Sequence, residues 1–414
     1  MNIIEQTFQR IEYEKFLLNR YRKIPAETEK ILQDKLHRYK YRIDVRNYFS
    51  RLSLLKREAS EVDEHSSYAK QYGVRGVRKF FSTNGEVIYR IPVLSFPGDD
   101  WRSHFTNCYL IVGKQVVLID CGTTFSEKGF EEGMGVVRNF YGEDIGTEDI
   151  DSIIITHGHV DHFAGLSFLY PKCNADIMVH EMDAEAVEEV GARHRMVHHA
   201  IKEFLQQSGM PEARIKKLVD LHRMFKADLK GVPVTQRLSD GDRIINDYEI
   251  IHTPGHCPGA ICIKVGDVMF LGDHILNEIT PHQSPKFYMK GMGLIHYIPS
   301  LLKVYANTRD VCIGLPAHND AVPSIKTRTL EIIDMHHERL GSLLMLLTEP
   351  KNIYDLTNQY FSEIEGRELK GYDYMLAVEE IGAHLEYLVE TLKCVEVTTD
   401  RHDKKGVFLF RKSA

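Results

Sequence analysis

The segment spanning residues 156–165, THGHVDHFAG, constrains the fold of this chain more than any other. It places the imidazoles of His157, His159 and His162 and the carboxylate of Asp161 within six positions, directly after an apolar run. The interior of a strand does not tolerate that much desolvated polarity. A loop at the end of a strand, in contrast, can direct several side chains to one place. We therefore expect a buried strand that ends in a polar loop.

These side chains are of the kinds that bind transition metals. Neutral imidazole suits zinc, copper, iron and nickel, and a carboxylate adds charge neutralisation. His157 and His159, two positions apart, can face one ion, and Asp161 and His162 can face a second. A lone histidine is more often a packed or solvated group than a ligand. Four ligand-type residues at H-x-H-x-D-H spacing therefore predict metal binding.

The middle of the chain alternates between strand and helix patterns. Short β-rich runs bounded by Gly, Pro or Asn, such as NCYLIVG and QVVLIDCG, begin at about residue 84. Residues 181–230 have a helical pattern, whose apolar residues, such as Phe204 and Leu205, either line a pocket or form packing faces. Strands return with YEIIHTPGH, AICIKVG and VMFLGDH. This order predicts an α/β sandwich rather than one doubly wound sheet.

The two ends of the chain differ from the middle. Residues 1–83 have apolar residues at helical spacing and predict a helical N-terminal extension. We expect this extension to pack on the core or on a second subunit. Its basic residues outnumber its acidic ones, so nucleic-acid binding is the alternative. Residues 323–414 contain three helical segments and then CVEVTTD and GVFLFRK, the pattern of a C-terminal helical or winged-helix domain. The middle domain accordingly spans 84–322, with a helical insertion at about 181–230.

Composition and charge exclude several classes of protein. A formal charge of −7 over 414 residues gives no global attraction to nucleic acid or anionic membranes. No apolar run reaches the ~18 residues of a membrane span, and the charged start MNIIEQTFQRIEYEKF lacks the core of a signal peptide. The seven cysteines form no CxxC pair, which favours a reducing compartment. We expect a cytoplasmic protein with no membrane partner.

Five motifs in order make the region from about residue 85 to 322 resemble the metallo-β-lactamase superfamily. Each motif follows a β-type run: VLIDCG with Asp120, HGHVDH, TPGHCPGA with His256, FLGDH with Asp273, and LPAHND with His318. The resemblance implies an αββα sandwich. It departs at the last motif, where many members have Gly-His-Gly and this chain has Ala-His-Asn.

Carried over position by position, the resemblance implies two divalent metal ions, with zinc expected and iron or manganese as alternatives. The implied ligands are His157, His159 and His256 for the first ion, Asp161, His162 and His318 for the second, and Asp273 as a bridge. Asp120 would orient a ligand by accepting the ring N–H that faces away from the metal.

The implied reaction is hydrolysis by a metal-bridged hydroxide, since two ions ~3.5–4 Å apart lower the pKa of a shared water. Asp161 would orient the hydroxide and pass on its proton. His274 directly follows the bridging Asp273 and can reach the cleft as a proton donor or substrate contact. These roles serve acyl and phosphoryl substrates alike, so the metal site does not name the substrate.

The stretch from Asp273 to Lys412 resembles one subgroup, the β-lactamase-like protein 2 or glyoxalase-like group with a C-terminal winged helix. We expect hydrolysis of a small acyl substrate, a thioester or an ester, by a homo-oligomer, namely a dimer. A metal-dependent endoribonuclease or other phosphodiesterase is the alternative. A non-catalytic regulator is a third hypothesis, against which the full ligand set argues.

Charge in the C-terminal segment favours the acyl substrate over nucleic acid. Nucleic-acid binders gain much of their affinity from Lys and Arg side chains on phosphates. The expected recognition helix, MLAVEEIGAHLEYLVETLK, carries four glutamates and a single lysine. It is therefore expected to repel a phosphate backbone.

Overall fold

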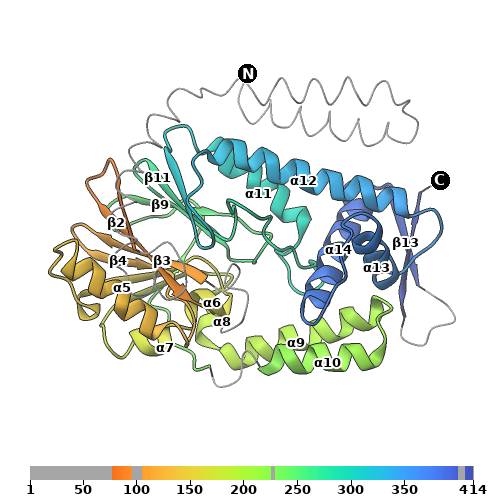
Figure 1. Ribbon diagram of the computed structural model, residues 1–414, viewed down its shortest axis with the longest axis horizontal. Helices are drawn as coiled ribbons and strands as arrows, with labels where there is room; N and C mark the ends of the chain where they lie inside the picture. The colour runs from red at the N-terminus through yellow and green to blue at the C-terminus, as the bar shows by residue number, and fades with distance from the viewer. Residues whose placement is uncertain (1–76, 96–104, 225–228, 400–405, 414) are drawn as a thin grey trace.

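Two mixed β-sheets lie face to face in the computed structural model, which describes residues 77–95, 105–224, 229–399 and 406–413 (Figure 1). The strands of the first sheet follow chain order: β1 (Arg78–Phe81), β2 (Val87–Leu94), β3 (Phe105–Val112), β4 (Val116–Ile119), β5 (Ser152–Ile155), β6 (Asp176–His180) and β7 (Gln236–Leu238). The second sheet has the order β12 (Ile313–Pro316), β11 (Val268–Gly272), β10 (Ile261–Val265), β9 (Tyr248–His252) and β8 (Arg243–Ile244).

Helices cover the outer face of each sheet, which gives the predicted αββα sandwich. Those that precede or join the strands are α5 (Glu127–Asn139), the 3-10 turn η2 (Thr147–Asp149), α6 (Val160–Phe163), α7 (Leu166–Leu169), α8 (Ala184–Glu188), α9 (Val190–Gln207), α10 (Glu212–Met224) and α11 (Leu294–Ala306). Helix α5 packs on the first sheet and α11 on the second. Among the described residues, no helix combines the length and apolar character that crossing a bilayer requires.

Strand β5 shows why an apolar run belongs at the centre of this sandwich. Its side chains alternate between the two sides of the sheet. Ile153 and Ile155 pack in the core shared with α5, whereas Ile154 packs between the two sheets. A strand covered on both faces is built largely of apolar residues, as the run Ile153–Ile155 is. The histidines and Asp161 follow after the strand has ended.

Two parallel strand pairs bring the ends of four strands to one edge of the sandwich. Strand β4 pairs with β5, and β11 pairs with β12, in parallel. The carboxyl ends of parallel strands meet at the same edge of a sheet, where α/β proteins place their ligand sites. Asp120 and Asp273 directly follow β4 and β11, and His157 and His318 follow β5 and β12 after one further residue. The topology therefore gathers motifs that lie far apart in the sequence.

The predicted boundary at residue 84 falls inside a hairpin. Arg78–Phe81 pair with β2 in antiparallel register, so the first sheet already begins within the segment 1–83 that was expected to be a helical extension. The run RKFF is too short and too basic to indicate a strand by itself. The remainder of the predicted extension, residues 1–76, lies outside the described residues.

The C-terminal segment has the predicted order of three helices and a two-stranded antiparallel sheet. These elements are α12 (Ile325–Leu346), α13 (Ile353–Glu363), α14 (Asp373–Glu390), β13 (Val395–Thr399) and β14 (Phe408–Lys412). Their apolar side chains do not form a separate core among the described residues, because they share one cluster with α9, α10 and α11. Figure 1 shows α14 between α12 and the insertion helices. We call α12 to β14 the C-terminal module.

Apolar residues of the helical insertion form packing faces. Phe204 and Leu205 are buried in the cluster shared with the C-terminal module. A Cβ atom added to Gly382 of α14 would lie 2.5 Å from the Phe204 ring, so that glycine is what admits the aromatic ring. Of the two alternatives for these side chains, packing is the one that the structure shows.

Gly165 provides a test of how closely the two loops of the site pack. A Cβ atom at this position would lie 1.9 Å from the carbonyl oxygen of Cys121, which directly follows Asp120. We expect Gly165→Ala to lower the free energy of unfolding by about 1–3 kcal/mol through overpacking. Gly341→Ala, in α12 with nothing within 4 Å of the added atom, should raise it by about 0.5–1 kcal/mol. Chemical denaturation measures both, and equal effects would contradict the packing.

Candidate metal centre

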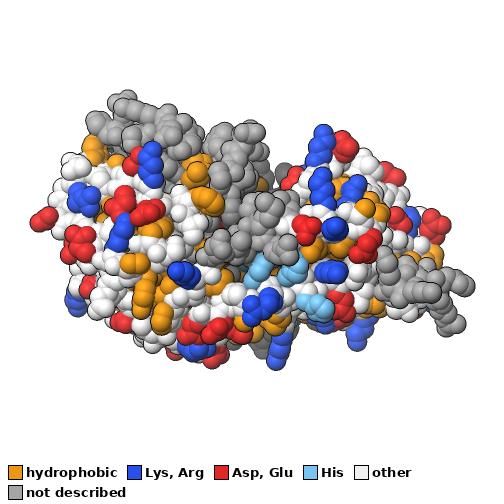
Figure 2. Space-filling model, turned by 90° about the horizontal axis from the view of Figure 1, so that it is seen from below, with side chains coloured by type: hydrophobic (Ala, Val, Ile, Leu, Met, Phe, Trp, Pro, Cys, Tyr) orange, Lys and Arg blue, Asp and Glu red, His pale blue; other side chains and the backbone are white. Residues whose placement is uncertain are grey.

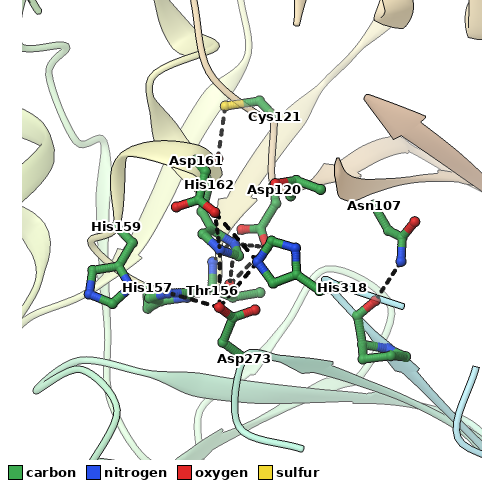
Figure 3. A network of polar contacts seen from close by, with 12 residues as sticks. Asn107, Asp120, Cys121, Thr156, His157, His159, Asp161, His162, Asp273 and His318 are labelled. Carbon is green, nitrogen blue, oxygen red and sulfur yellow. Dashed lines mark hydrogen bonds and ion pairs between the residues drawn. The ribbon is translucent and has the colours of Figure 1, made fainter. Parts of the chain in front are cut away.

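The loop that follows β5 carries the first four candidate ligands. The strand ends at Ile155, His157 and His159 lie in the loop, and α6 starts at Val160 and places Asp161 and His162 in its first turn. Because α6 follows a loop of only four residues, 156–159, the four side chains lie in one region (Figure 3).

The first group of candidate ligands consists of His157, His159, His256 and Asp273, one ligand atom of each lying within 4.8 Å of the others. Nδ1 of His159 is 3.0 Å from Nε2 of His157 and 3.0 Å from Nε2 of His256. A tetrahedral zinc ion with ~2.05 Å bonds to nitrogen separates its ligand atoms by roughly 3.3 Å. The spacing of the nitrogens is therefore close to that of a zinc site.

Asp273 connects this group to a second one, formed by Asp161, His162 and His318. Its Oδ2 atom is 3.2 Å from Nε2 of His318 and 3.6 Å from Nε2 of His162. The same oxygen is 3.5 Å from Nε2 of His256. One carboxylate oxygen thus lies near imidazole nitrogens of both groups.

Oxygen atoms behind the rings orient three of the imidazoles. The pairs are Nδ1 of His162 with Oδ2 of Asp120 at 2.8 Å, Nδ1 of His256 with the carbonyl of His282 at 2.7 Å, and Nδ1 of His318 with the carbonyl of Phe105 at 2.7 Å. A carbonyl or carboxylate oxygen accepts, so the hydrogen of a neutral ring is on Nδ1. The lone pair of Nε2 then faces the cluster, as metal ligation requires.

Two buried atoms in the cluster have no hydrogen-bond partner among the described residues. They are Nε2 of His162 and Oδ1 of Asp273. Unpaired buried polar atoms are costly, and an ion is one of the few things that accounts for them. Imidazole nitrogens with carboxylate oxygens are a donor set that suits zinc and iron. The residues present therefore fit divalent transition metals.

The charges of the cluster depend on which imidazoles face carboxylates. Burial lowers the pKa of His157 and of His256. Burial acts in the same direction on His162, but the carboxylates around it, Asp120 first, raise its pKa to about 10. Without a cation the carboxylates therefore retain protons on neighbouring rings, and metal binding would release them.

A comparison with known families identifies the fold. Residues 101–323, more than half of the chain, match the model of the Metallo-beta-lactamase superfamily. This chain belongs to the metallo-beta-lactamase superfamily. "Probable metallo-hydrolase YqjP" of Bacillus subtilis (strain 168) is 21% identical over 322 residues, which are 74% of this chain and 93% of that protein. "Probable metallo-hydrolase MJ0888" of Methanocaldococcus jannaschii is 28% identical over 172 residues, 41% of this chain and 67% of that protein.

Solved structures have the same fold over most of the chain. A metallo-beta-lactamase family protein from Thermus thermophilus aligns with a TM-score of 0.61 and 22% identity, covering 79% of this chain and 98% of its own. A beta-lactamase domain protein from Burkholderia ambifaria aligns with a TM-score of 0.62 and 19% identity, covering 81% and 94%. Superfamily membership and the metallo-hydrolase relatives confirm the prediction of a metallo-β-lactamase-fold hydrolase. The subgroup remains a prediction from the sequence.

The departure from Gly-His-Gly at the fifth motif has a conformational explanation. Asn319 has a φ of +63°, in the left-handed region that glycine adopts most easily. Asparagine is among the few other residues that tolerate this region. Nδ2 of Asn107 also donates to the carbonyls of Pro316 and Asn319, at 3.0 and 2.9 Å. The loop therefore keeps its path, and His318 reaches the cluster.

His274 lies outside both groups. Its ring is buried and lies 5.2 Å from the ring of Tyr297, centroid to centroid. Burial lowers the pKa of His274 to about 3, so the ring is neutral at physiological pH. The proposed role as proton donor or substrate contact remains a prediction.

Asp183, which the sequence did not single out, connects two ligand loops. Its Oδ2 atom accepts a hydrogen bond from the backbone N–H of Gly158 at 2.8 Å, between His157 and His159. A Cβ atom added to Gly259 would lie 2.7 Å from the side chain of Asp183, so the loop after His256 packs directly on it. No spacing rule could reveal this residue, because the group that it binds in the first ligand loop is a backbone N–H rather than a side chain.

A third group of ligand-type residues, His336, Glu380 and His384, lies in the C-terminal module. Nδ1 of His384 is 2.6 Å from the carbonyl of Glu380, and its Nε2 is 3.0 Å from Nδ1 of His336. Nη1 of Arg339 donates to the Glu380 carboxylate at 2.7 Å. Nε2 of His336 has no hydrogen-bond partner among the described residues, but both oxygens of the Glu380 carboxylate are already bound, by Arg339 and by the N–H of Gln283, so we assign no metal to this group.

Asp120 provides a test of ligand orientation. Its carboxylate accepts from the N–H and the hydroxyl of Thr156, both at 2.8 Å, as well as from His162. The amide of Asp120→Asn has one accepting atom and cannot serve all three donors. We expect metal affinity to fall about 10–100-fold, measured by competition with a chromophoric chelator.

Asp151→Asn is the matched control, since Asp151 also accepts a backbone N–H, from Val116 at 2.8 Å, but is exposed. Equal affinities for the wild type and both variants would contradict the role of Asp120.

Proposed function

We propose that this protein is a dinuclear metal-dependent hydrolase of small acyl substrates, thioesters or esters. The observation that carries the proposal is the position of Asp273, whose Oδ2 lies within 4.0 Å of imidazole nitrogens from both ligand groups. His157, His159 and His256 would hold one ion, Asp161, His162 and His318 the other, and Asp273 both. Zinc fits this donor set, with iron or manganese as alternatives.

The chain itself supplies proton handling and orientation. Two bound ions would lower the pKa of a shared water and polarise a scissile carbonyl oxygen. Asp161 and His318 keep 19% and 16% of their side chains exposed, whereas His157 and His162 keep 1% and 0%. Solvent can therefore reach the second group at Asp161 and His318. The carboxylate of Asp161 can accept the proton that an attacking water loses.

Helix α14 favours an acyl substrate, although not for the reason that its sequence suggested. Its glutamates were expected to repel a phosphate backbone. Glu379 and Glu380 are instead buried, with 3% and 8% of each residue exposed. Apolar residues all around the helix are buried as well. A helix enclosed in this way cannot enter a nucleic-acid groove. Its burial, rather than its charge, therefore counts against a nucleic-acid substrate.

The surface provides a second argument. On the face shown in Figure 2, described basic and acidic side chains are interspersed. Nucleic-acid binding relies on Lys and Arg gathered on one face. Hydrolysis of a phosphodiester remains the alternative, because the two ligand groups would serve it equally well. We retain the winged-helix assignment of the C-terminal module, and its role as a dimer or lid contact, within this proposal.

Metal content tests the two ligand groups separately. We expect the wild type to bind two equivalents of a transition metal. His159→Ala should lose one equivalent, and Asp273→Ala should weaken both because its carboxylate lies between the groups. Both variants should lose activity.

Elemental analysis and activity with a chelator measure these effects. The exposed residues His199 and Asp176 provide matched alanine controls that should retain two equivalents. A wild type without bound metal, whose activity survives the chelator, would refute the proposal.

A substrate panel tests the choice of chemistry. We expect the purified protein to cleave members of a series of acyl thioesters and esters, and the chelator to abolish this. Asp273→Ala protein, purified in the same way, controls for contaminating esterases and nucleases. Single-stranded RNA should bind more weakly than micromolar. Micromolar RNA binding that falls steeply with salt, together with metal-dependent cleavage, would show that the acyl substrate is wrong.

A further inference from the structure

The metal ligand candidate His256 is oriented by a backbone group rather than by a carboxylate. Its Nδ1 lies 2.7 Å from the carbonyl oxygen of His282, in the loop between β11 and α11. Its Nε2 lies 3.0 Å from Nδ1 of His159 and 3.5 Å from Oδ2 of Asp273. The carbonyl of His282 therefore sets both the tautomer and the direction of His256. A loop carbonyl can do this only if the loop itself is held.

Glutamates of α14 hold that loop from the opposite side. Nε2 of His282 is 2.9 Å from Oε2 of Glu379, and its Nδ1 is 3.4 Å from Oε2 of Glu380. The next two residues bind the same carboxylates: Gln283 N–H donates to Glu380 at 2.7 Å, and the Ser284 hydroxyl donates to Glu379 at 3.1 Å. Three consecutive residues are thus bound by two adjacent side chains.

The glutamates are themselves fixed by buried partners. Tyr288 donates its hydroxyl to Oε1 of Glu379 at 3.0 Å, and Arg339 of α12 donates to Oε1 of Glu380 at 2.7 Å. Burying two carboxylates is expensive, and apolar residues of similar size often stabilise a fold equally well. The arrangement is therefore better explained by the geometry that it imposes on His282 than by stability.

We propose that Glu379 and Glu380 are positioning residues for the metal ligand His256, acting through the carbonyl of His282. The inference rests on the proposed metal centre. His282 is not itself a ligand, because both of its ring nitrogens face glutamates. The C-terminal module thus completes the first ligand group without contributing a ligand to it. The second group has its own supports, Asp120 and the carbonyl of Phe105, and does not depend on α14.

Glutamine variants test the inference. Glu379→Gln and Glu380→Gln keep the shape of the side chain and remove the charge that holds His282. We expect the dissociation constant of one zinc equivalent to rise about 10–100-fold and that of the other to stay unchanged. A cobalt(II) titration should show altered absorption for the affected equivalent only. The double variant Glu379→Gln/His282→Asn should lose no more zinc affinity than Glu379→Gln or His282→Asn alone, since both substitutions act through the contact between these two side chains.

The control is Glu386→Gln. Glu386 lies on the same helix and accepts the N–H of Lys286 from the same loop at 2.9 Å, but it does not bind His282. Thermal unfolding of the metal-free proteins separates loss of fold from loss of metal affinity. Unchanged zinc affinity and cobalt spectra in both variants, or an equal loss in Glu386→Gln, would overturn the inference and leave the proposed function intact. A wild type that binds no metal would overturn both.

Discussion

The carboxylate of Asp273 is the interaction on which the site depends. One of its oxygens lies near imidazole nitrogens from both ligand groups, which come from three separate loops. Removing a carboxylate and several imidazoles from water is costly unless each is paired. Two sets of partners offset this cost. Asp273 and Asp161 face the imidazoles within the cluster (Figure 3). Oxygens behind the rings bind the outward N–H groups of His162, His256 and His318.

The architecture explains why such a cluster forms at this edge. Four strands in two parallel pairs end there, one pair in each sheet. In β5, apolar side chains fill both faces of the strand up to its last residue, Ile155. Polar residues that follow directly therefore meet other polar residues, not the core. The two sheets of the sandwich converge on a single site because each contributes the loops at its carboxyl edge.

The C-terminal module is joined to this edge by charge as well as by apolar packing. Its apolar residues share a core with the helical insertion and α11. Its buried glutamates hold the loop that contains His282, and that loop contacts His256. A segment that looks like a separate domain in sequence is thus continuous with the ligand groups through side-chain and backbone contacts. The insertion, the module and the first ligand group form one connected structure.

The sequence by itself predicted the sandwich and the candidate ligands. Dense polar motifs directly after apolar runs can be recognised locally, because the candidate ligands His157, His159, Asp161 and His162 are neighbours in the chain. Their order relative to Asp120, His256, Asp273 and His318 then indicated the family. Strand β1 could not be read in this way, since its run RKFF becomes a strand only by pairing with β2.

Tertiary structure alone decided which residues support the ligands. Asp183 binds a backbone N–H of the first ligand loop, and a backbone carbonyl orients His256, so neither interaction leaves a side-chain pattern in the sequence. Nothing in the local sequence marks Glu379 and Glu380 of α14 as buried, and it is the packing of the loop against α14 that buries these two. Long-range contacts of this kind depend on where separate segments meet in space, and local periodicity does not encode that.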